Sequence, residues 1–342
     1  MERVDPLSGD GWDAWVMSHP DACFFHTSAW ARVLREACGY RPSYFAVCEA
    51  GRLRALLPVM EAASFLTGRR GVSLPYTDFC QPLVSEGVAF DKLLSEVLAY
   101  GKRQGWKYLE CRGGRNLLPE VRPSLSFYGH TLDLSGGAER LLAGCESGVR
   151  RAIRKAERAG VRVEFSLTVE SLRCFYALYC NTRKKHGLPP QPFKFFQRIW
   201  EHVIARDQGF VALGWLGQRP IAGAVFFHVG MKALFKYGAS EEAFLPLRGN
   251  NLVMWEAIKR CAGSGYHELH FGRTSLGNKG LRAYKRGWGV QEHLLEYFRY
   301  DLRKDAYVAP EDRSYGWHNR VFHLMPVPLC RLAGAVLCRH WS

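Results

Sequence analysis

The amino-acid sequence repeats one pattern in its two halves. Residues 44–60 (YFAVCEAGRLRALLPVM) are typical of two strands around a turn at Gly51, because β-forming residues flank a glycine. Residues 210–228 (FVALGWLGQRPIAGAVFFH) show the same two apolar runs around Gly217 and Gln218. Each half therefore is expected to contain a β-hairpin.

A helix followed by a strand repeats as well. Residues 93–109 are helical in pattern and end in GWKYL, and residues 252–269 end in GYHEL. The glycines at the helix-to-strand transition, Gly105 and Gly265, lie at nearly the same spacing along the chain as the two hairpin turns. The correspondence favours two copies of one unit, with a chance resemblance between two hairpins as the alternative.

A hairpin, a helix and a strand, twice over, predict an α/β fold of the α+β kind with mixed sheets. A chain of 342 residues has room for two domains. We expect an N-terminal domain at 1–150, a C-terminal domain at 151–305 and a basic, apolar C-terminal tail at 306–342. A basic helix over 139–160, ending at a glycine, is expected to join the halves.

The net charge of +15 indicates an anionic partner. Nucleic acid, a phosphate-bearing donor such as coenzyme A, a diphosphate-linked precursor and an anionic membrane surface all fit that charge. The eleven cysteines are scattered and never spaced Cys-x-x-Cys, so the sequence predicts neither a disulfide framework nor a zinc ribbon. The N-terminus (MERVDPLSGDGW) lacks the pattern of a signal peptide, and we expect a cytoplasmic location.

Two clusters of cations mark candidate anion sites. Arg151, Lys155 and Arg158 follow one another at helical spacing in the joining helix and form one cationic face. This face either binds phosphates or is a solvated helix surface. The cluster Arg183–His186, before GLPPQP, either rims an anion site or ends a helix against its dipole.

The segment 267–296 is the richest in candidate site residues. A strand is expected to reach Phe271, followed by a loop rich in Gly, Lys and Arg and then an aromatic and basic cluster at 284–289. Glycines beside cations let a charged ligand approach the backbone, which suits an active-site wall. The spacing of Gly272–Lys279 departs from a phosphate-binding P-loop, and His267 and His270 do not form a metal motif.

The chain has no Gly-x-Ser-x-Gly elbow, no kinase motif set and no cysteine that stands out as an activated nucleophile. We therefore expect direct transfer, in which an amine attacks an activated carbonyl. In such a reaction the protein positions the reactants and supplies a cation for the developing oxyanion.

Several segments together resemble the FemAB-type proteins of the GNAT superfamily, particularly a branch associated with exopolysaccharide and envelope loci. They include FFHTSAWARVL, SLPYTDFCQPLV, RRAIRKAERAGVRVE, LPLRGNNLVMWEAI and HFGRTSLGNKGLRAYKRGWG. The resemblance extends over nearly the whole chain to about Tyr300. It implies two tandem GNAT-like acyltransferase domains.

The resemblance also implies roles for residues. Lys285 matches the family lysine that orients the donor or stabilises the transition state, with Tyr284 and Trp288 shaping its pocket. The alternative is a surface lysine beside a packed aromatic residue. Arg273 matches a basic position at a strand end, where it contacts the acceptor or a phosphate or acts as a structural ion-pair partner. Asp78, within LPYTDFC, accepts a proton or holds the acceptor amine, or else caps its own turn.

The family transfers aminoacyl groups from charged tRNA to peptidoglycan precursors, and other members use acyl-CoA. The coiled-coil arm of the tRNA-using members has no room after Gly160, which disfavours tRNA. The GNAT pyrophosphate loop is partly mirrored by Arg248 and Gly249, which with Arg151 and Lys155 are our candidate donor-binding residues. No permanently bound cofactor and no metal are expected.

The tail segment 321–338 is apolar but interrupted by prolines and Arg331, so it is too broken to span a bilayer. It is expected to lie in an anionic inner-membrane surface or to dock onto the protein itself.

The sequence as a whole predicts an N-acyltransferase that acts on a cell-envelope or exopolysaccharide precursor. A non-catalytic protein that binds an anionic glycan or nucleic acid is the competing class. A small-molecule N-acetyltransferase is a third possibility.

Overall fold

The computed structural model of the protein describes residues 1–310, 322–338 and 340. The chain divides into two compact units, each made of segments that are separate in sequence. Unit 1 comprises Met1–Phe127, Leu294–Arg313 and Val336–Ser342, and unit 2 comprises Tyr128–His293 and Ser314–Ala335. The domain limits predicted from the sequence mark two copies of one fold, whereas these units are defined by how compactly their residues pack. The predicted limits therefore stay a prediction.

Among its described residues, unit 1 contains short strands and helices. In chain order they are β1 (Glu2–Val4), α1 (Trp12–Met17), α2 (Ser28–Cys38), β2 (Arg41–Pro42), β3 (Tyr44–Glu49), β4 (Arg52–Leu57), β5 (Met60–Ser64), β6 (Gly68–Val72), β7 (Leu83–Val84), α3 (Phe90–Arg103), β8 (Trp106–Arg112) and β17 (Ala306–Tyr307). Short 3₁₀ helices cover Phe24–His26 and Arg115–Leu117. The limits of the units fall inside β9 (Leu125–Asp133), β16 (Gln291–Asp301) and α11 (Val327–Leu337).

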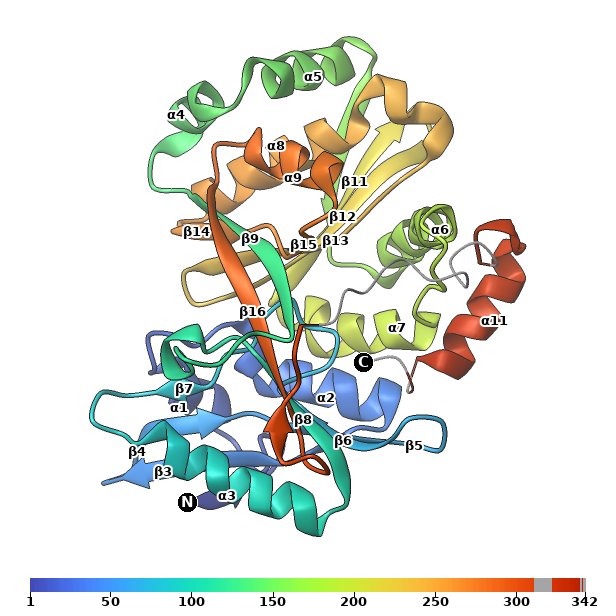
Figure 1. Ribbon diagram of the computed structural model, residues 1–342. Coiled ribbons are helices and arrows are strands. Elements are labelled where there is room, and N and C mark those ends of the chain that lie inside the picture. The colour runs from blue at the N-terminus through green and yellow to red at the C-terminus, as the bar shows by residue number, and fades with distance from the viewer. Residues whose placement is uncertain (311–321, 339, 341–342) are drawn as a thin grey trace. The chain divides into compact units, whose positions relative to one another are not determined.

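The strands of unit 1 pair in both directions. β3 and β4 form an antiparallel hairpin, β6 and β8 run parallel, and the part of β16 from Tyr297 onward pairs antiparallel with β8. Helix α3 lies along these strands (Figure 1) and buries its apolar face in a core that includes Phe45, Val97 and Phe298. The helix forms because apolar residues recur along one of its faces.

Unit 2 contains a longer antiparallel sheet and the longest helices. Its elements are α4 (Gly137–Gly144), α5 (Ser147–Arg158), β10 (Val161–Ser166), α6 (Val169–Lys185), α7 (Phe193–His202), β11 (Gly209–Leu216), β12 (Arg219–Val229), β13 (Lys232–Ser240), α8 (Gly249–Gly263), β14 (Glu268–His270), β15 (Thr274–Ser275) and α9 (Lys279–Arg286). Short 3₁₀ helices cover Ile204–Arg206 and Glu242–Leu247. Strands β10 to β13 are antiparallel, and β14 joins them parallel to β13.

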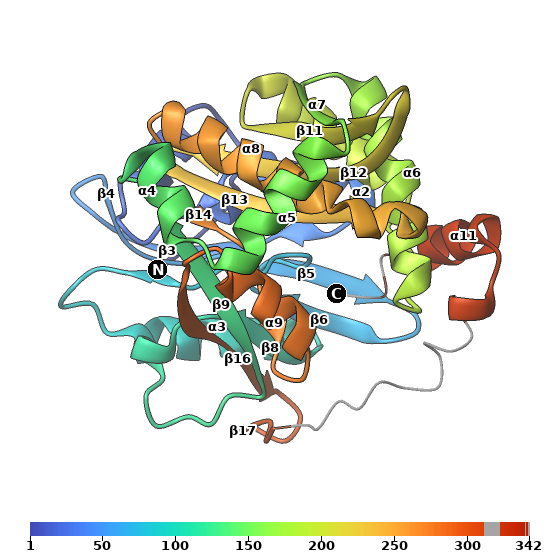
Figure 2. The ribbon, with the colours of Figure 1, turned by 90° about the horizontal axis from the view of Figure 1, so that it is seen from above.

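Helices cover both faces of the β10–β13 sheet. A Cβ added at Gly214 would meet Val253 of α8, whereas one at Gly223 would meet Phe175 of α6. These helices therefore pack on opposite faces, and α5 packs beside α8 (Figure 2). Parallel and antiparallel pairs in each unit confirm the predicted α/β class with mixed sheets.

The repeat seen in the sequence is present in the structure. The predicted hairpins are β3–β4 and β11–β12, and the predicted helix-to-strand steps are α3–β8 and α8–β14. All four glycines at corresponding turns adopt positive φ angles, of 75° at Gly51, 60° at Gly217, 69° at Gly105 and 83° at Gly265. A left-handed backbone is what glycine permits at low cost, which explains the shared residue.

Two local predictions are wrong. The single joining helix is two helices, α4 and α5, because Cys145 is extended and Glu146, with ψ near 150°, is also outside the helical region. The backbone N–H of Glu146 donates to the carbonyl of Gly287 at 2.8 Å, which draws the chain out of the helical path. The expected loop after Phe271 folds in part into α9, whose N-terminus is capped by the side chain of Asn278.

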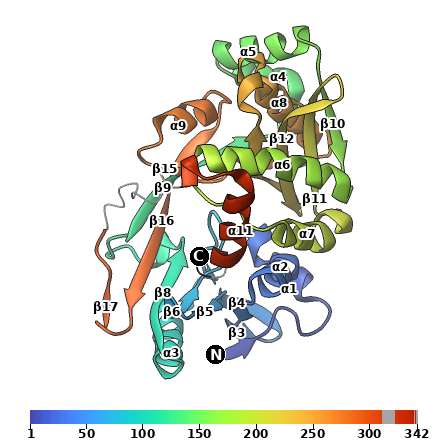
Figure 3. The same cartoon turned by 90° about the vertical axis from the view of Figure 1, so that its right-hand side faces the viewer.

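The predicted tail contains α11, which lies beside α6 in Figure 3. Part of the tail, residues 311–321, 339 and 341–342, lies outside the described residues. Among the described residues, no helix is long and apolar enough to cross a membrane.

Candidate functional site

A cationic hollow in unit 2 brings together four residues predicted to bind the donor. It has a volume of about 430 Å³ and is lined by Gly148, Val149, Arg151, Ala152, Lys155, Arg248, Asn251 and Tyr284. Arg151 and Lys155 project from α5 one helical turn apart, and Tyr284 comes from α9. The lining therefore contains three cations and no carboxylate.

The hollow lies at the N-terminus of α8, a helix of 15 residues. Arg248 caps this end with a left-handed backbone (φ 63°), and Gly249, the first helical residue, is buried. A Cβ at Gly249 would lie 3.1 Å from Ile221 of β12, so glycine lets the helix end approach the sheet. The N-terminus of a helix attracts anions, because its first N–H groups lack intrahelical partners.

Tyr284 is a hydrogen-bond donor at neutral pH. Burial raises the pKa of its hydroxyl, although the neighbouring Trp288 opposes this rise. The two rings meet edge to face with centroids 6.1 Å apart, and Trp288 is completely buried. A protonated phenol suits a site for a phosphate or carboxylate oxygen.

Lys285 follows Tyr284 on α9 and is buried, with only 3% of its surface exposed. Its Nζ donates hydrogen bonds to the carbonyls of Gly272 and Arg273, each at 3.0 Å. The alternative of a surface lysine is therefore wrong. Arg273 is half-buried, and its predicted contact with acceptor or phosphate stays a prediction.

A polar cluster beside Lys285 was not found from the sequence. The Nε2 of His130, on β9, lies 3.1 Å from Oε2 of Glu292, and Arg282 binds both oxygens of that carboxylate at 2.9 and 2.7 Å. The guanidinium of Arg282 lies 3.9 Å from the ring centroid of Tyr128. His130 and Glu292 are far apart in sequence, so no local spacing could have indicated the cluster.

The pKa of the His130 imidazole is lowered from its usual value. Burial lowers the pKa of its imidazole, the positive charge of Lys285 lowers it further, and Glu292 opposes both effects. Because the carboxylate accepts the hydrogen bond, the proton of the neutral ring belongs on Nε2. The Nδ1 atom is buried and has no hydrogen-bond partner within the described part of the chain.

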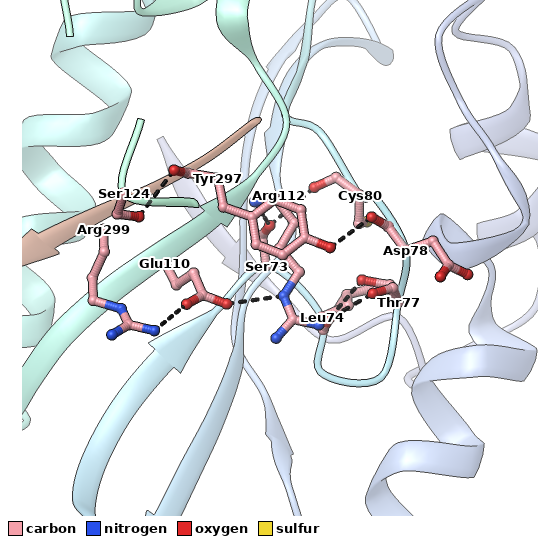
Figure 4. Close-up of polar contacts among 10 residues, drawn as sticks. All are labelled: Ser73, Leu74, Thr77, Asp78, Cys80, Glu110, Arg112, Ser124, Tyr297 and Arg299. Atoms are coloured by element: carbon pink, nitrogen blue, oxygen red, sulfur yellow. Dashed lines mark hydrogen bonds and ion pairs between the residues drawn. The ribbon is translucent and has the colours of Figure 1, made fainter. Parts of the chain in front are cut away.

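In unit 1, Asp78 lies in a loop with an unusual backbone. Leu74 and Tyr76 both have positive φ angles, of 57° and 61°, although neither is glycine. Such conformations cost free energy and persist only where surrounding contacts impose them. The hydroxyl of Tyr297 donates to the main-chain oxygen of Asp78 at 2.6 Å, and the Asp78 side chain points away from the Glu110–Arg112 pair (Figure 4).

A buried ion network holds this loop. Arg112 donates through its backbone N–H to Ser73 Oγ at 2.7 Å and through its side chain to the carbonyl of Thr77 at 3.3 Å. Its Nε donates to Glu110 at 2.9 Å, and Arg299 donates to the other oxygen of Glu110 at 2.6 Å (Figure 4). Burial alone would raise the pKa of Glu110, but the two guanidinium groups lower it to about 2.

The predicted site residues thus fall into two groups. Arg151, Lys155, Arg248 and Tyr284 line one hollow in unit 2, and Gly249 begins α8 at that hollow. Lys285 lies on α9, Trp288 lies just after that helix, and Arg273 lies between β14 and β15. Asp78 belongs to unit 1. Its proposed catalytic role and that of Lys285 stay predictions.

Comparison with known proteins identifies the type of fold. Residues 144–286 match the family model described as the acetyltransferase (GNAT) domain. The chain has a GNAT-type acyltransferase fold. The matched segment contains the cationic hollow, α8 and Lys285.

Solved structures extend this likeness beyond the matched segment. The crystal structure of FemX is 16% identical and has a TM-score of 0.70, covering 89% of this chain and 98% of its own. The C-terminal domain of a putative lysylphosphatidylglycerol synthetase from Agrobacterium fabrum is 15% identical, with a TM-score of 0.56 over 79% of this chain and 86% of its own. A search of curated proteins found no match.

A tandem GNAT protein from the clavulanic acid biosynthesis pathway is also similar. It is 12% identical and has a TM-score of 0.52, covering 83% of this chain and 88% of its own. At these identities the likeness is one of fold. Together with the internal repeat, it confirms the prediction of two GNAT-like domains.

Proposed function

We propose that this protein is a FemAB-type N-acyltransferase that moves an acyl or aminoacyl group onto an amine of a cell-envelope or exopolysaccharide precursor. The observation that carries the proposal is the cationic hollow at the N-terminus of α8, with Tyr284 in its wall and the buried Lys285 next along α9. The hollow suits the phosphates of a donor. The neighbouring lysine suits the developing charge of a transferred carbonyl.

The donor is an acyl-CoA or an aminoacyl-tRNA, both of which carry phosphates. GNAT domains use acyl-CoA, and the match over residues 144–286 supports that donor. Arg151, Lys155 and Arg248 would bind its phosphates as point charges or bidentate partners, and the first N–H groups of α8 would add to them. Transfer RNA is not favoured, because the described residues after Gly160 form no coiled-coil arm.

In the reaction, the lone pair of an amine attacks the carbonyl carbon of the donor. The new C–N bond forms, the C–S bond of a thioester or the C–O bond of an ester breaks, and the amine loses one proton. Lys285 would stabilise the negative charge that develops on the carbonyl oxygen. We propose Asp78 as the acceptor of the proton or the group that holds the amine.

The proposed acceptor rests on the resemblance to the FemAB family. The structural likeness to FemX and to a putative lysylphosphatidylglycerol synthetase domain is consistent with transfer onto an envelope component. An amine on a diphosphate-linked sugar or peptide precursor also fits a protein with a net charge of +15.

The test is a thermal-shift series with acetyl-CoA, longer acyl-CoAs and charged tRNA. A ligand that binds only the native state raises the melting temperature. We expect a shift with an acyl-CoA that is reduced in the double variant Arg151→Ala, Lys155→Ala. The matched control is Arg158→Ala, because Arg158 lies on the same helix but does not line the hollow.

The outcomes separate the candidate functions. A shift with charged tRNA alone would identify an aminoacyltransferase. A tight acetyl-CoA site with turnover of small amines would identify a small-molecule N-acetyltransferase. Salt-sensitive binding of an anionic glycan or nucleic acid, without a response to any donor, would overturn the proposal in favour of a binding protein.

A further inference from the structure

Helix α11 exposes an apolar ridge. Leu329, Leu332 and Val336 are 52%, 64% and 59% exposed, and Leu324, just before the helix, is 81% exposed. The first three are spaced i, i+3 and i+7, so they lie on one face of the helix. Contiguous exposed apolar side chains on a folded protein are typical of surfaces that contact a partner or a membrane.

The opposite face of α11 is fixed to unit 2. Cys330 and Gly334 are buried, and a Cβ on Gly334 would lie only 1.8 Å from the carbonyl oxygen of Pro190. The guanidinium of Arg331 lies 5.3 Å from the ring centroid of Tyr176, on α6. The helix is therefore held along the protein surface, with its ridge directed outward.

Positive charges lie near the ridge, and acids are absent from its sequence. Residues 322–342 contain no Asp or Glu. The ammonium of Lys184 is near enough to Cys330 to oppose the rise that burial causes in the pKa of that thiol. The Nδ1 of His323 lies 3.2 Å from the carbonyl oxygen of Lys185, at the C-terminal end of α6. The ammonium of Lys185 is paired with Glu242 at 2.7 Å, so the positive charge beside the segment comes from Lys184 and Arg331.

The length of the helix decides how it can meet a membrane. Its 11 residues span roughly 16 Å at 1.5 Å per residue, about half of a bilayer's hydrocarbon core. A short helix with one apolar face and neighbouring cations lies in the interface between lipid headgroups and acyl chains.

We propose that the outward face of α11 binds the surface of an anionic lipid bilayer, with the helix axis parallel to that surface. The apolar ridge enters the headgroup region, while the positive charges of Arg331, on the flank of the helix beside Tyr176, and of Lys184 attract the lipid phosphates. Charge complementarity favours lipid over a protein partner, because an apolar protein interface does not require this cationic rim. The proposal does not depend on the proposed enzyme activity.

The test measures sedimentation of the full chain with vesicles of phosphatidylcholine alone and of phosphatidylcholine with phosphatidylglycerol. We expect binding to the anionic vesicles that weakens with added salt. The double variant Leu329→Gln, Leu332→Gln should weaken binding at least about tenfold, because two leucine side chains no longer pass from water into the apolar part of the bilayer. Arg331→Gln should weaken it about fivefold, near the value for one surface cation.

The control is the double variant Leu167→Gln, Met231→Gln. These side chains are 43% and 47% exposed and lie outside α11, so their replacement should leave vesicle binding unchanged. Unfolding curves establish that all variants remain folded. The proposal is overturned if the native protein ignores anionic vesicles, if the α11 variant binds as well as the control, or if α11 instead forms a dimer that its leucine substitutions dissociate.

Discussion

The Nε of Arg112 lies 2.9 Å from Oε1 of Glu110, two residues earlier on the same strand, β8. Residues at this spacing share one face of a strand, and this face is buried. Arg299, on the neighbouring strand β16, completes the network at 2.6 Å from the other carboxylate oxygen. The network joins two strands of unit 1 to the backbone of the Asp78 loop.

We predict that Glu110→Gln strongly destabilises the protein. The substitution leaves the buried guanidinium of Arg112 and the half-buried one of Arg299 without their counter-charge. Removing one partner of a buried ion pair costs about 3–5 kcal/mol in other proteins. Urea unfolding at pH 7 measures the loss of free energy of unfolding. The control is Glu49→Gln, whose carboxylate pairs with Arg54 at the surface and should contribute less than about 1 kcal/mol. Equal stability of the two variants would contradict a structural role for the network.

The same carboxylate predicts a loss of stability in acid. The pKa of Glu110 is lowered to about 2 in the folded state, whereas the pKa of a glutamate in the unfolded chain is near 4.5. The folded protein therefore favours the ionised carboxylate more strongly than the unfolded chain does. The stabilisation is complete above pH 4.5 and disappears as the pH falls from 4.5 to about 2, by about 3 kcal/mol. Stability of the native protein and of Glu110→Gln, measured across this range, should converge as the pH falls.

Tyr297→Phe tests whether the Asp78 loop matters for transfer. The change removes the hydroxyl that donates to the Asp78 carbonyl but keeps the ring that lies 5.3 Å from the Arg112 guanidinium. We expect about 1 kcal/mol of lost stability and a tenfold or greater loss of kcat, because the loop loses a tether. Tyr300→Phe is the control on the same strand, since its hydroxyl binds the exposed Asp305. Unchanged kcat in Tyr297→Phe would show that this hydrogen bond is structural only.

The architecture was predictable because its signals are local. Apolar runs, turn glycines and helical spacing fix hairpins and helices within short windows, and Gly105 and Gly265 occupy the same turn in both copies. The cationic hollow was predictable in part for the same reason, since Arg151 and Lys155 lie one turn apart on a single helix. The approach of Arg248 and Tyr284 to them depends on the tertiary fold.

Contacts made through pairing of distant segments were not predictable. Glu110 and Arg112 could be assigned to one strand face by their spacing, but Arg299 joins them only through the register of β16 with β8. The break between α4 and α5 likewise depends on a hydrogen bond from Glu146 to Gly287, far along the chain. Such features follow from tertiary contacts that override local propensity.

The imidazole of His130 provides a prediction that needs no substrate. Its pKa should lie below 6.5, because it is buried and near the positive charge of Lys285. Glu292→Gln should lower the pKa further, and Lys285→Met should raise it, since each removes one of the two opposing charges. Titration by NMR of the histidine ring measures all three values. Shifts in the opposite directions would show that the cluster is arranged differently.

Lys285 is the residue whose replacement should affect transfer most. Lys285→Ala removes the cation held by the carbonyls of Gly272 and Arg273, and we expect kcat/KM to fall about 10²–10³-fold, as when one donor to an oxyanion is removed. The fold should remain intact, with a lower melting temperature because two carbonyls lose their hydrogen bonds. Lys285→Met separates charge from volume, since it fills the same space and should be as inactive as alanine.

The control for Lys285 is Lys279→Ala, at the exposed start of the same helix, which should retain activity. Rates are compared with the donor that stabilises the native protein against heat. A folded Lys285→Met variant with full activity would remove the lysine from the mechanism, whereas loss of activity in both lysine variants would point to the overall charge of α9. Selective loss at position 285, with donor binding preserved, would place the cation in the transfer step itself.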